Sequence, residues 1–387
     1  MAKRILILVG IPHFNYYDEK SAVALFLKQV KTALEDENTL VDFPDASDEV
    51  LVPSKSVQNN SGVVKNILKK WNWGYQTLSY EVYRRKQDVL LSKLLNKKPY
   101  DHVVEFHTVG STIGKVLANK WKAKLSVMFD SPVHEQFVEM KKTKTLFWNH
   151  IKNSEREIME AADRIMAYSP ACKDYLMRRY KIKATMTTLP CVVSKQTVER
   201  TPPEDVFNIL FIGSFLSWHK VDLLVKAFKE VLKSNEKARL QLIGFGEEWA
   251  NIQEYVKFEN LEEQIEMPGF VSENELNQYK AKANIAIMPG SNWYGSPLKL
   301  FEYAQSGIPF IAPQTPTVKS IFSEEHCLFI DSSNELTSLI ACVQSYAASE
   351  KLRIEKQTRA TELYADRFAS TRYHKQLKFA LINEEPS

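Results

Sequence analysis

The residues of this chain with the clearest chemical potential lie close together, from Ser296 to Tyr303, in the run SPLKLFEY. Serine caps free backbone amides at a helix start and Pro297 is tolerated at the first helical position, so the run predicts a helix N-terminus whose N–H groups face an anion. Lys299, at the third helical position, adds a positive charge. Glu302 follows three residues later, and a carboxylate there suits the hydroxyls of a ribose. The run therefore predicts a site for a nucleotide diphosphate.

The same spacing has a simpler interpretation, which carries equal weight at this point. A capped amphipathic helix with Lys299 and Glu302 as a surface ion pair would show the same pattern. In either case we expect the helix to end at Gly307, because glycine readily adopts the left-handed conformation that follows many helices. A buried strand over residues 308–312 follows.

Short apolar runs alternate with helical patterns along the whole chain, which is typical of parallel sheets covered by helices. Helical spacing of apolar residues fills most of the gaps, and Ser272 with Glu275 forms a capping box for one of these helices. In the first half, strands are expected at residues 4–9, 50–52, 102–106, 125–129 and 164–168, and in the second half at 207–212, 239–243, 265–267, 284–288, 309–312 and 327–330.

Length and composition limit the class of protein. A chain of 387 residues exceeds what one hydrophobic core usually holds, so two domains are expected. The net charge of +4 is too small to indicate nucleic-acid binding by itself. The four cysteines show no metal-ligand spacing and indicate a reducing compartment. The first apolar run is too short for a signal peptide, and no run approaches the 18 residues of a membrane span, so a cytoplasmic location is expected.

A family resemblance rests on residues 289–313, PGSNWYGSPLKLFEYAQSGIPFIAP. This run resembles the donor-site signature of the GT-B glycosyltransferases of the large retaining family 4. The resemblance implies that Glu302 contacts the ribose of a nucleotide sugar. Many members carry a second glutamate eight positions upstream, where this chain has Tyr294, so the signature does not specify the sugar.

A second segment, residues 210–224, combines a strand, a loop and a helix start, and it is similar to the family's phosphate-binding loop. Common members place an arginine and a lysine where this chain has Ser214 and His219, and a glycine where it has Lys220. We expect Lys299, together with Lys220 or His219, to supply the charge that stabilises a departing diphosphate. A solvated loop histidine is the alternative for His219.

Two further turns resemble parts of the donor site. Gly244 lies in a turn that lines the family's donor cleft, and Phe270 with Val271 resembles the turn whose backbone holds the base. A core position is the favoured alternative for Phe270. The predicted donor-binding residues are Gly213, Ser214, His219, Lys220, Gly244, Phe270, Val271, Tyr294, Ser296, Pro297, Leu298, Lys299 and Glu302.

In the first half, polar residues follow two expected strands. His107 follows one, and Asp130 follows the next, where many relatives have a histidine near the donor sugar. Since the carboxyl ends of parallel strands are favoured ligand positions, we expect Asp130 to orient an acceptor hydroxyl or take its proton, with a helix N-cap as the alternative. The predicted catalytic residues are Asp130, His107, Lys299 and Glu302.

Metal ligands are not evident in the sequence, which has no Asp-x-Asp and no suitable His, Asp and Glu spacing. The chain is therefore predicted to need no metal or other cofactor, with the helix N-terminus and cations in place of a divalent ion. The resemblance implies front-face attack assisted by the leaving phosphate.

Basic and aromatic residues gather in residues 65–98 and again in 141–152. This combination suits an anionic membrane surface, which would place the chain at the inner face of the plasma membrane as a peripheral protein. Solvated helix faces over a core are the alternative.

These observations predict an α/β protein of GT-B type, with two Rossmann-like, doubly wound domains facing a central cleft. The predicted domains are 1–200 for the acceptor and 201–365 for the donor, with a helix at about 366–387 packing back on the first domain. The predicted function is retaining, metal-independent hexosyl transfer from a nucleotide sugar to a glycan or lipid-linked acceptor in polysaccharide or glycoconjugate synthesis. A catalytically silent subunit that binds a partner, and a GT-B epimerase or phosphorylase, are the alternatives.

Overall fold

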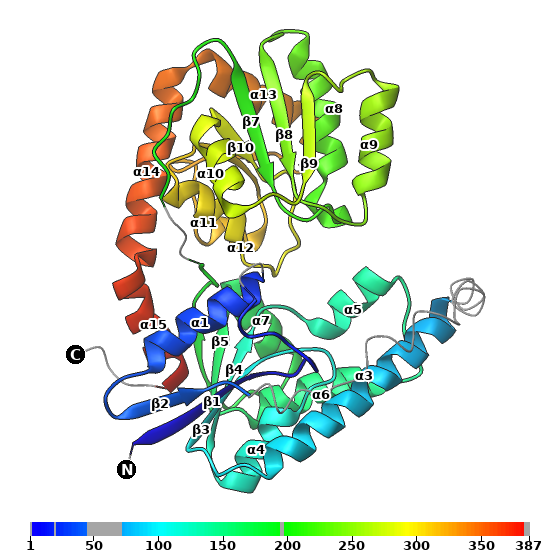
Figure 1. Cartoon of the computed structure of the whole chain (residues 1–387), viewed down its shortest axis with the longest axis vertical. Coiled ribbons are helices and arrows are strands. Elements are labelled where there is room, and N and C mark those ends of the chain that lie inside the picture. Colours follow the sequence, from blue (N-terminus) through cyan, green and yellow to red (C-terminus); the bar gives the residue numbers. More distant parts are fainter. Residues whose placement is uncertain (1, 19–20, 45–71, 194–196, 383–387) are drawn as a thin grey trace. The chain divides into compact units, whose positions relative to one another are not determined.

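The chain forms two compact α/β units in a computed structural model that describes residues 2–18, 21–44, 72–193 and 197–382 (Figure 1). Unit 1 comprises residues 1–191 and 374–387, and unit 2 comprises residues 192–373. The first division falls nine residues before the predicted domain boundary, which follows residue 200. The second lies inside the last helix of the chain.

Unit 1 is built on a six-stranded parallel sheet of order β2-β1-β3-β4-β5-β6. Strand β1 is buried along most of its length, which is typical of a sheet with helices on both faces (Figure 1). The strands are β1 (Lys3–Val9), β2 (Thr39–Asp42), β3 (His102–Phe106), β4 (Lys124–Phe129), β5 (Arg164–Ala167) and β6 (Thr185–Thr188).

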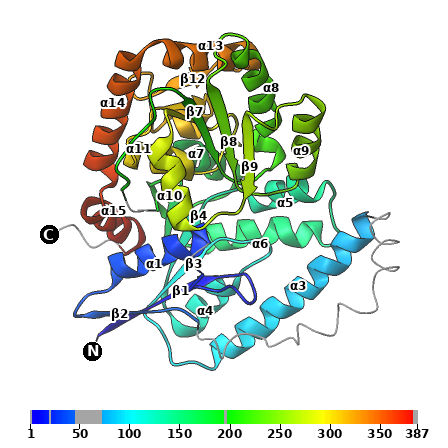
Figure 2. The same ribbon diagram turned by 45° about the horizontal axis from the view of Figure 1, so that its top comes forward.

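Each strand of unit 1 from β1 to β5 is followed by at least one helix that leads to the next strand, as parallel pairing requires. Helix α3 packs on α4, and α4 packs in turn on α6 (Figure 2). The helices are α1 (Ala22–Leu34), α3 (Asn72–Leu95), α4 (Ile113–Trp121), α5 (Val133–Lys141), α6 (Trp148–Ala161) and α7 (Pro170–Arg179).

Unit 2 has a second six-stranded parallel sheet, of order β12-β11-β10-β7-β8-β9. This order is doubly wound. From β7 the chain adds β8 and β9 on one side of the sheet, and it then returns to add β10, β11 and β12 on the other side of β7. The strands are β7 (Phe207–Ile212), β8 (Ala238–Ile243), β9 (Ile265–Gly269), β10 (Ile285–Ile287), β11 (Phe310–Pro313) and β12 (Leu328–Ile330).

The core of unit 2 lies between this sheet and the helices that cover it, with Phe211, Phe215 and Phe228 among its largest buried side chains. Helix α10 begins with the predicted capping box, in which Ser272 and Glu275 bond reciprocally. The helical elements are η2 (Ser217–His219), α8 (Val221–Leu232), α9 (Trp249–Phe258), α10 (Glu273–Lys282), α11 (Leu298–Gln305), α12 (Pro316–Lys319), α13 (Glu335–Ala348) and α14 (Glu350–Phe368).

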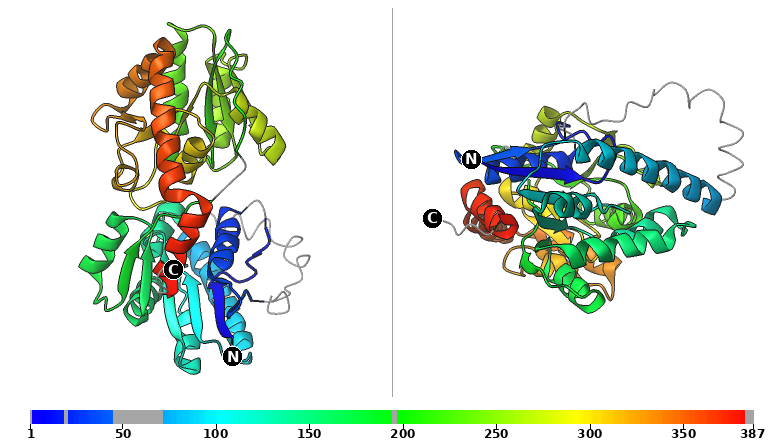
Figure 3. Two further views of the ribbon diagram at one scale, coloured as in Figure 1. Left: turned by 90° about the vertical axis from the view of Figure 1, so that its left-hand side faces the viewer. Right: turned by 90° about the horizontal axis from the view of Figure 1, so that it is seen from below.

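The last helix, α15 (Ser370–Ile382), begins in unit 2 and its residues from His374 belong to unit 1 (Figure 3). Near its end, Ser126 of β4 donates a hydrogen bond of 2.5 Å to the carbonyl of Leu381. Lys378 forms an ion pair of 2.6 Å with Asp36, on the turn before β2. The helix that the sequence places at about 366–387 thus divides here into the end of α14 and α15.

Two strands were not predicted, β2 and β6, and they form the two edges of the unit 1 sheet. Each is four residues long and keeps exposed positions, so neither shows the continuous apolar run of a central strand. The strand predicted at residues 50–52 lies outside the described residues. The other predicted strands are present, with ends that shift by one or two residues.

Candidate functional site

The predicted donor residues of unit 2 gather where its sheet reverses winding. Gly213 follows β7, the loop to α11 follows β10, and β7 and β10 are neighbours in the sheet. In doubly wound sheets this point leaves a crevice beyond the carboxyl ends of the strands, because the following helices pass to opposite faces. The two sequence segments with family resemblance therefore meet at one place.

Lys299 lies directly over the backbone of Gly213. A Cβ atom at position 213 would come within 1.9 Å of the Lys299 Cε atom, so a larger residue there would displace the lysine side chain. Burial lowers the pKa of Lys299 to about 8, against the opposing effect of the Glu302 charge. The ammonium group is thus protonated in most molecules at neutral pH, in surroundings that solvate it poorly.

His219 accepts a hydrogen bond from this lysine and carries no charge of its own. Its Nδ1 lies 2.6 Å from the carbonyl of Ser214 and must donate to it, so Nε2 is left as an acceptor, 3.5 Å from the Lys299 Nζ. Burial and the Lys299 charge lower the pKa of His219 to about 4, which keeps the ring neutral. The alternative of a solvated loop histidine is wrong, since His219 is buried.

Lys220 is occupied elsewhere. Its Nζ forms an ion pair of 2.7 Å with Glu335, at the start of α13. The backbone of Lys220 has φ of 50°, in the left-handed region that glycine favours, which agrees with the glycine that common members of the resembling family have here. Of the residues expected to supply charge here, Lys220 is paired with Glu335 and His219 is neutral, so among the described residues the prediction now rests on Lys299.

The start of α11 differs from the prediction. Pro297, not Ser296, is the N-cap, so Lys299 is the second helical residue. The amides of Leu298 and Leu300 already donate to the carbonyls of Ser296 and Pro297, at 2.9 Å each, because the chain enters the helix through a tight turn. Fewer backbone donors than expected therefore remain for an anion. The helix ends as predicted, with Gly307 in the left-handed conformation.

Glu302 is not half of a surface ion pair with Lys299. It is buried, and its Oε1 lies 3.2 Å from the Nζ of Lys280, a residue of α10 that is only 1% exposed. Sequence reasoning missed Lys280. The available signal was its position four residues after Leu276, which places it on the inward face of α10.

The neighbouring turns pack backbone against backbone. A Cβ atom at Gly244, whose φ is 127°, would lie 1.9 Å from the carbonyl oxygen of Gly213. The Gly244 amide donates to the carbonyl of Gly269, at 2.9 Å. Phe270 follows, and its side chain is 84% exposed, so the core alternative is wrong. Val271 beside it is half-buried, and Tyr294 is buried.

The predicted residues of unit 1 follow adjacent strands, β3 and β4. His107 is buried, and its amide donates to the carbonyl of Met128 at 3.0 Å. Burial raises the pKa of Asp130 to about 6, although the charge of His107 opposes the rise. Asp130 is not a helix cap, because α5 has Pro132 at its N-cap; it accepts a hydrogen bond of 3.1 Å from Ser131.

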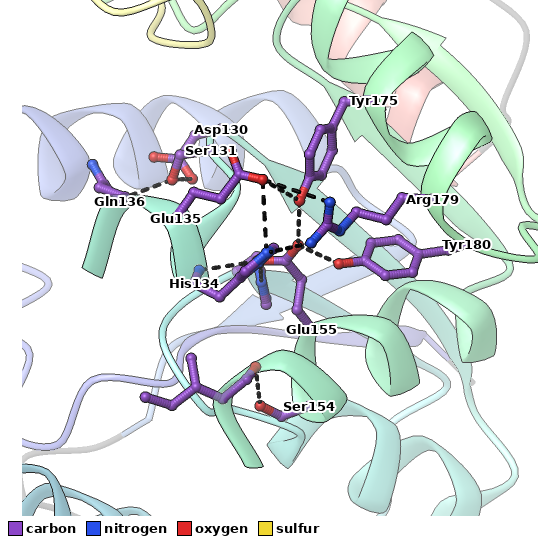
Figure 4. Close-up of polar contacts among 12 residues, drawn as sticks. Asp130, Ser131, His134, Glu135, Gln136, Ser154, Glu155, Tyr175, Arg179 and Tyr180 are labelled. Carbon is purple, nitrogen blue, oxygen red and sulfur yellow. Dashed lines mark hydrogen bonds and ion pairs between the residues drawn. The ribbon is translucent and has the colours of Figure 1, made fainter. Parts of the chain in front are cut away.

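A buried cluster around Glu155 of α6 was not predicted (Figure 4). Its carboxylate accepts a hydrogen bond of 2.7 Å from Tyr180, and it lies 3.1 Å from His134 and 3.6 Å from His107. Burial alone would raise the pKa of Glu155, but the contacts with both histidines hold it well below its usual range. The signal for it was the position of Glu155 four residues after Ile151, on the apolar face of α6.

Two properties of the described residues bear on the kind of site. They contain no group of three or more His, Cys, Asp or Glu side chains that is placed to hold a metal ion. None of the helices within the described ranges is both long and apolar enough to cross a membrane.

Comparison with known proteins gives a consistent result. Residues 193–362 match the family of Glycosyl transferases group 1. An uncharacterized glycosyltransferase of Haemophilus influenzae is 25% identical over 135 residues, which is 34% of this chain and 37% of that protein. The chain thus aligns with little more than a third of this curated relative.

Solved structures with a similar fold align with nearly the whole chain. Sucrose-phosphate synthase from Thermosynechococcus elongatus has a TM-score of 0.70 at 16% identity, with 97% of each chain covered. WaaG, a glycosyltransferase involved in lipopolysaccharide biosynthesis, scores 0.68 at 12% identity, covering 98% of this chain and all of its own. HepE from Anabaena, in complex with UDP and glucose, scores 0.66 at 12% identity, covering 97% and 98%.

These likenesses confirm the predicted GT-B fold of two parallel-sheet α/β units. Together with the family match and the curated relative, they support a glycosyltransferase.

Lys299→Met should stabilise the protein at neutral pH. The folded pKa of about 8 lies below the unfolded value of 10.5, so the unfolded chain binds more protons between them, and wild-type stability should rise with pH across that window. Methionine keeps the aliphatic stem without the charge, and we expect the free energy of unfolding to rise by about 1–3 kcal/mol at pH 7. Urea unfolding measures it. Lys226→Met, at an exposed position, is the control, and a loss of stability in Lys299→Met would contradict the assignment.

Glu302→Ala should be more damaging than the double variant Lys280→Met, Glu302→Ala. The single change leaves the Lys280 ammonium buried without its partner, which costs about 3–5 kcal/mol. The double change removes both charges. Equal unfolding free energies for the two variants, measured in urea, would show that Lys280 finds water or another carboxylate.

Proposed function

We propose that this chain is a retaining glycosyltransferase of family 4, which transfers a sugar from a nucleotide-diphosphate sugar to a glycan or lipid-linked acceptor without a metal ion. Polysaccharide or glycoconjugate synthesis is the proposed setting. The observation that carries the proposal is the poorly solvated Lys299 ammonium over Gly213, at the point where the unit 2 sheet reverses winding. That unit also contains the match to the Glycosyl transferases group 1.

The proposed donor is a nucleotide sugar whose diphosphate contacts Lys299. Negative charge grows on the diphosphate as the bond to the sugar breaks, and a fixed cation in poorly solvated surroundings stabilises it with little reorganisation. Because an anion would restore the solvation that Lys299 has lost, binding should favour the protonated lysine. HepE, bound to UDP and glucose, supports UDP as the first nucleotide to test.

Glu302 is the proposed ribose contact. Its Oε1 lies 3.2 Å from the Nζ of Lys280, and each carboxylate oxygen can accept more than one hydrogen bond, as two ribose hydroxyls would require. The buried Lys280 would then fix the carboxylate in orientation. In unit 1, Asp130 is the proposed acceptor-side group, which accepts the hydrogen bond of the attacking hydroxyl.

UDP binding should weaken as pH rises through about 8, because Lys299 loses its proton there. Calorimetric titration with UDP between pH 6.5 and 9.5 measures the effect. Lys299→Arg should retain binding and lose this pH dependence, since guanidinium stays protonated. Lys299→Met should weaken binding at least tenfold at pH 7. Binding by Lys299→Met that equals wild type would overturn the proposed phosphate contact.

The purified wild-type protein also serves to test the proposed sugar transfer. Thermal-shift screening with UDP, GDP, ADP and CMP sugars identifies the donor, because a ligand of the folded state raises its stability. Transfer or donor hydrolysis in excess EDTA, with the anomeric configuration read by NMR, tests metal independence and retention. A donor that binds yet is neither transferred nor hydrolysed with any acceptor would favour a silent subunit, which the serine and tyrosine at positions 214 and 294 also suggest.

An anionic membrane surface is the proposed partner of unit 1. The structure joins the two basic and aromatic regions: Asn72 of α3 donates to the carbonyl of Lys141 at 2.8 Å, and the Leu146 amide donates to Thr77 at 3.1 Å. Arg84 and Arg85 farther along α3 are paired with Glu81, and Arg84 also with Asp88, so two carboxylates offset their charge there. Exposed apolar side chains beside this junction are Trp73, Leu78, Met140 and Leu146, and exposed lysines are Lys141, Lys142 and Lys144.

Replacing Lys141, Lys142 and Lys144 by glutamate should abolish flotation with vesicles that contain anionic lipid. Each lysine near such a surface contributes about 1 kcal/mol, and the effect should diminish with salt. Replacing Lys226, Lys233 and Lys237 of unit 2, which are also exposed, changes the net charge equally and is the control. No flotation of the wild type at low salt would end the membrane proposal without affecting the proposed reaction.

A further inference from the structure

Tyr303 is a fully buried residue of α11 whose hydroxyl bonds the end of a strand. It accepts a hydrogen bond of 3.1 Å from the amide of Ile212, the last residue of β7. The pairing of β7 with β10 covers Ile209 and Leu210, so this amide lies two residues past the paired stretch. A backbone amide inside a protein needs an acceptor, and the tyrosine hydroxyl provides one where the neighbouring strand has ended.

The spacing of Tyr303 and Lys299 connects this hydrogen bond to the candidate site. The two residues are four positions apart on α11, which places them on the same face of the helix. The Lys299 side chain lies over Gly213, and the Tyr303 hydroxyl bonds the residue directly before Gly213. One face of α11 therefore contacts two consecutive residues at the end of β7.

Other polar contacts hold α11 against other elements. Glu302 lies 3.2 Å from Lys280 of α10, and the carbonyl of Ala304 accepts a hydrogen bond of 3.0 Å from the Thr361 hydroxyl of α14. Neither contact involves β7. The helix is thus held by α10 and α14, and Tyr303 attaches the end of β7 to it.

The turn at Gly213 is also held from the side of β8. The Gly213 amide donates to the carbonyl of Ile243 at 2.8 Å, and the Gly213 carbonyl lies close against Gly244. The turn is therefore fixed by β8 on one side and by the Tyr303 hydroxyl on the other. Because the packing over Gly213 is so close, a displacement of the strand end would also displace the Lys299 side chain.

We propose that Tyr303 is a positioning residue of the nucleotide-sugar site, whose hydroxyl fixes the end of β7 against α11 and so keeps the Lys299 ammonium in place. The inference rests on the proposed function for its purpose, which is the contact between Lys299 and a diphosphate. Its geometry rests on contacts within unit 2 alone. Without the hydroxyl, the Ile212 amide loses this acceptor and turns toward water, and the surroundings of Lys299 change with it.

The first test is the titration of the Lys299 ammonium group in protein labelled with ¹³C at lysine Cε, with Lys299→Arg assigning its resonance. In wild type the midpoint should lie near pH 8. In Tyr303→Phe it should rise by roughly half a pH unit or more, because water then reaches the ammonium more easily. The two ionisable groups that interact with Lys299, His219 and Glu302, are the same in both proteins.

Tyr346→Phe is the matched control. Tyr346 of α13 is also fully buried in unit 2, and its hydroxyl donates to the carbonyl of Phe310 at 3.1 Å. Phe310 begins β11, so it lies at the opposite end of the parallel sheet from Gly213. The control loses a buried hydrogen bond of the same kind, and its Lys299 midpoint should equal that of wild type. An unshifted midpoint in Tyr303→Phe would overturn the proposal, and so would equal shifts in the two variants.

Hydrogen exchange of the Ile212 amide tests the contact in wild type, even if Tyr303→Phe folds poorly. The amide should be protected in wild type, and it should exchange at least roughly tenfold faster in Tyr303→Phe than in Tyr346→Phe. An Ile212 amide that exchanges in wild type as fast as an exposed loop amide would contradict the hydrogen bond on which the proposal depends.

UDP binding, measured by calorimetric titration at pH 7, gives the functional readout. Tyr303→Phe should weaken binding roughly threefold to tenfold, the equivalent of one hydrogen bond, and Tyr346→Phe should not weaken it. If wild type binds no UDP, the proposed donor fails, while the Lys299 titration and the exchange of the Ile212 amide still decide the role of Tyr303. Unchanged UDP affinity beside a shifted Lys299 midpoint would remove the diphosphate contact from the proposal.

Discussion

The half-buried ammonium group of Lys299 constrains the turns around it in unit 2. Lys299 sits where water reaches it poorly. The residues at three neighbouring positions are limited by the space and the hydrogen bonding around it. A side chain at position 213 would displace the lysine stem, which occupies that space. Position 244 must lack one as well, because the Gly213 carbonyl is pressed against it. His219 must be neutral and must carry its proton on Nδ1, so that Nε2 can receive the lysine. Each of these requirements concerns a single residue, yet together they fix the turns that follow β7 and β8.

Unit 1 buries carboxyl groups. Its buried ionisable groups include the carboxylates of Glu155 and Glu105, which among the described residues meet neutral donors in place of a lysine or arginine. Tyrosine hydroxyls and a backbone amide take much of that role, at Glu155 and at Glu105. Such networks are sensitive to the loss of any member, since a buried acceptor without its donor is costly.

The sequence predicted those features that depend on continuous local patterns. Central strands such as Phe207–Ile212 show as apolar runs, and Gly307 shows as a helix stop, because each is determined by a few adjacent residues. The edge strands were missed, since a strand with one neighbour keeps polar positions. The helix start at Ser296 was wrong by one residue, because the tight turn before α11 satisfies two amides with backbone carbonyls. Lys280 and Glu155 escaped notice because a charged residue on an apolar helix face gives no sign of the distant partner that it meets.

The path of α15 has a consequence for how the protein is made. Unit 1 is discontinuous along the chain: residues 1–191 supply its sheet, and residues from His374 add the helix that receives the Ser126 hydroxyl. During synthesis, the first unit emerges from the ribosome long before that helix exists, and all of unit 2 is translated in between. Domains generally fold in order of emergence, so unit 1 must wait in an incomplete state, with β4 lacking its final cover, until the last helix has been released.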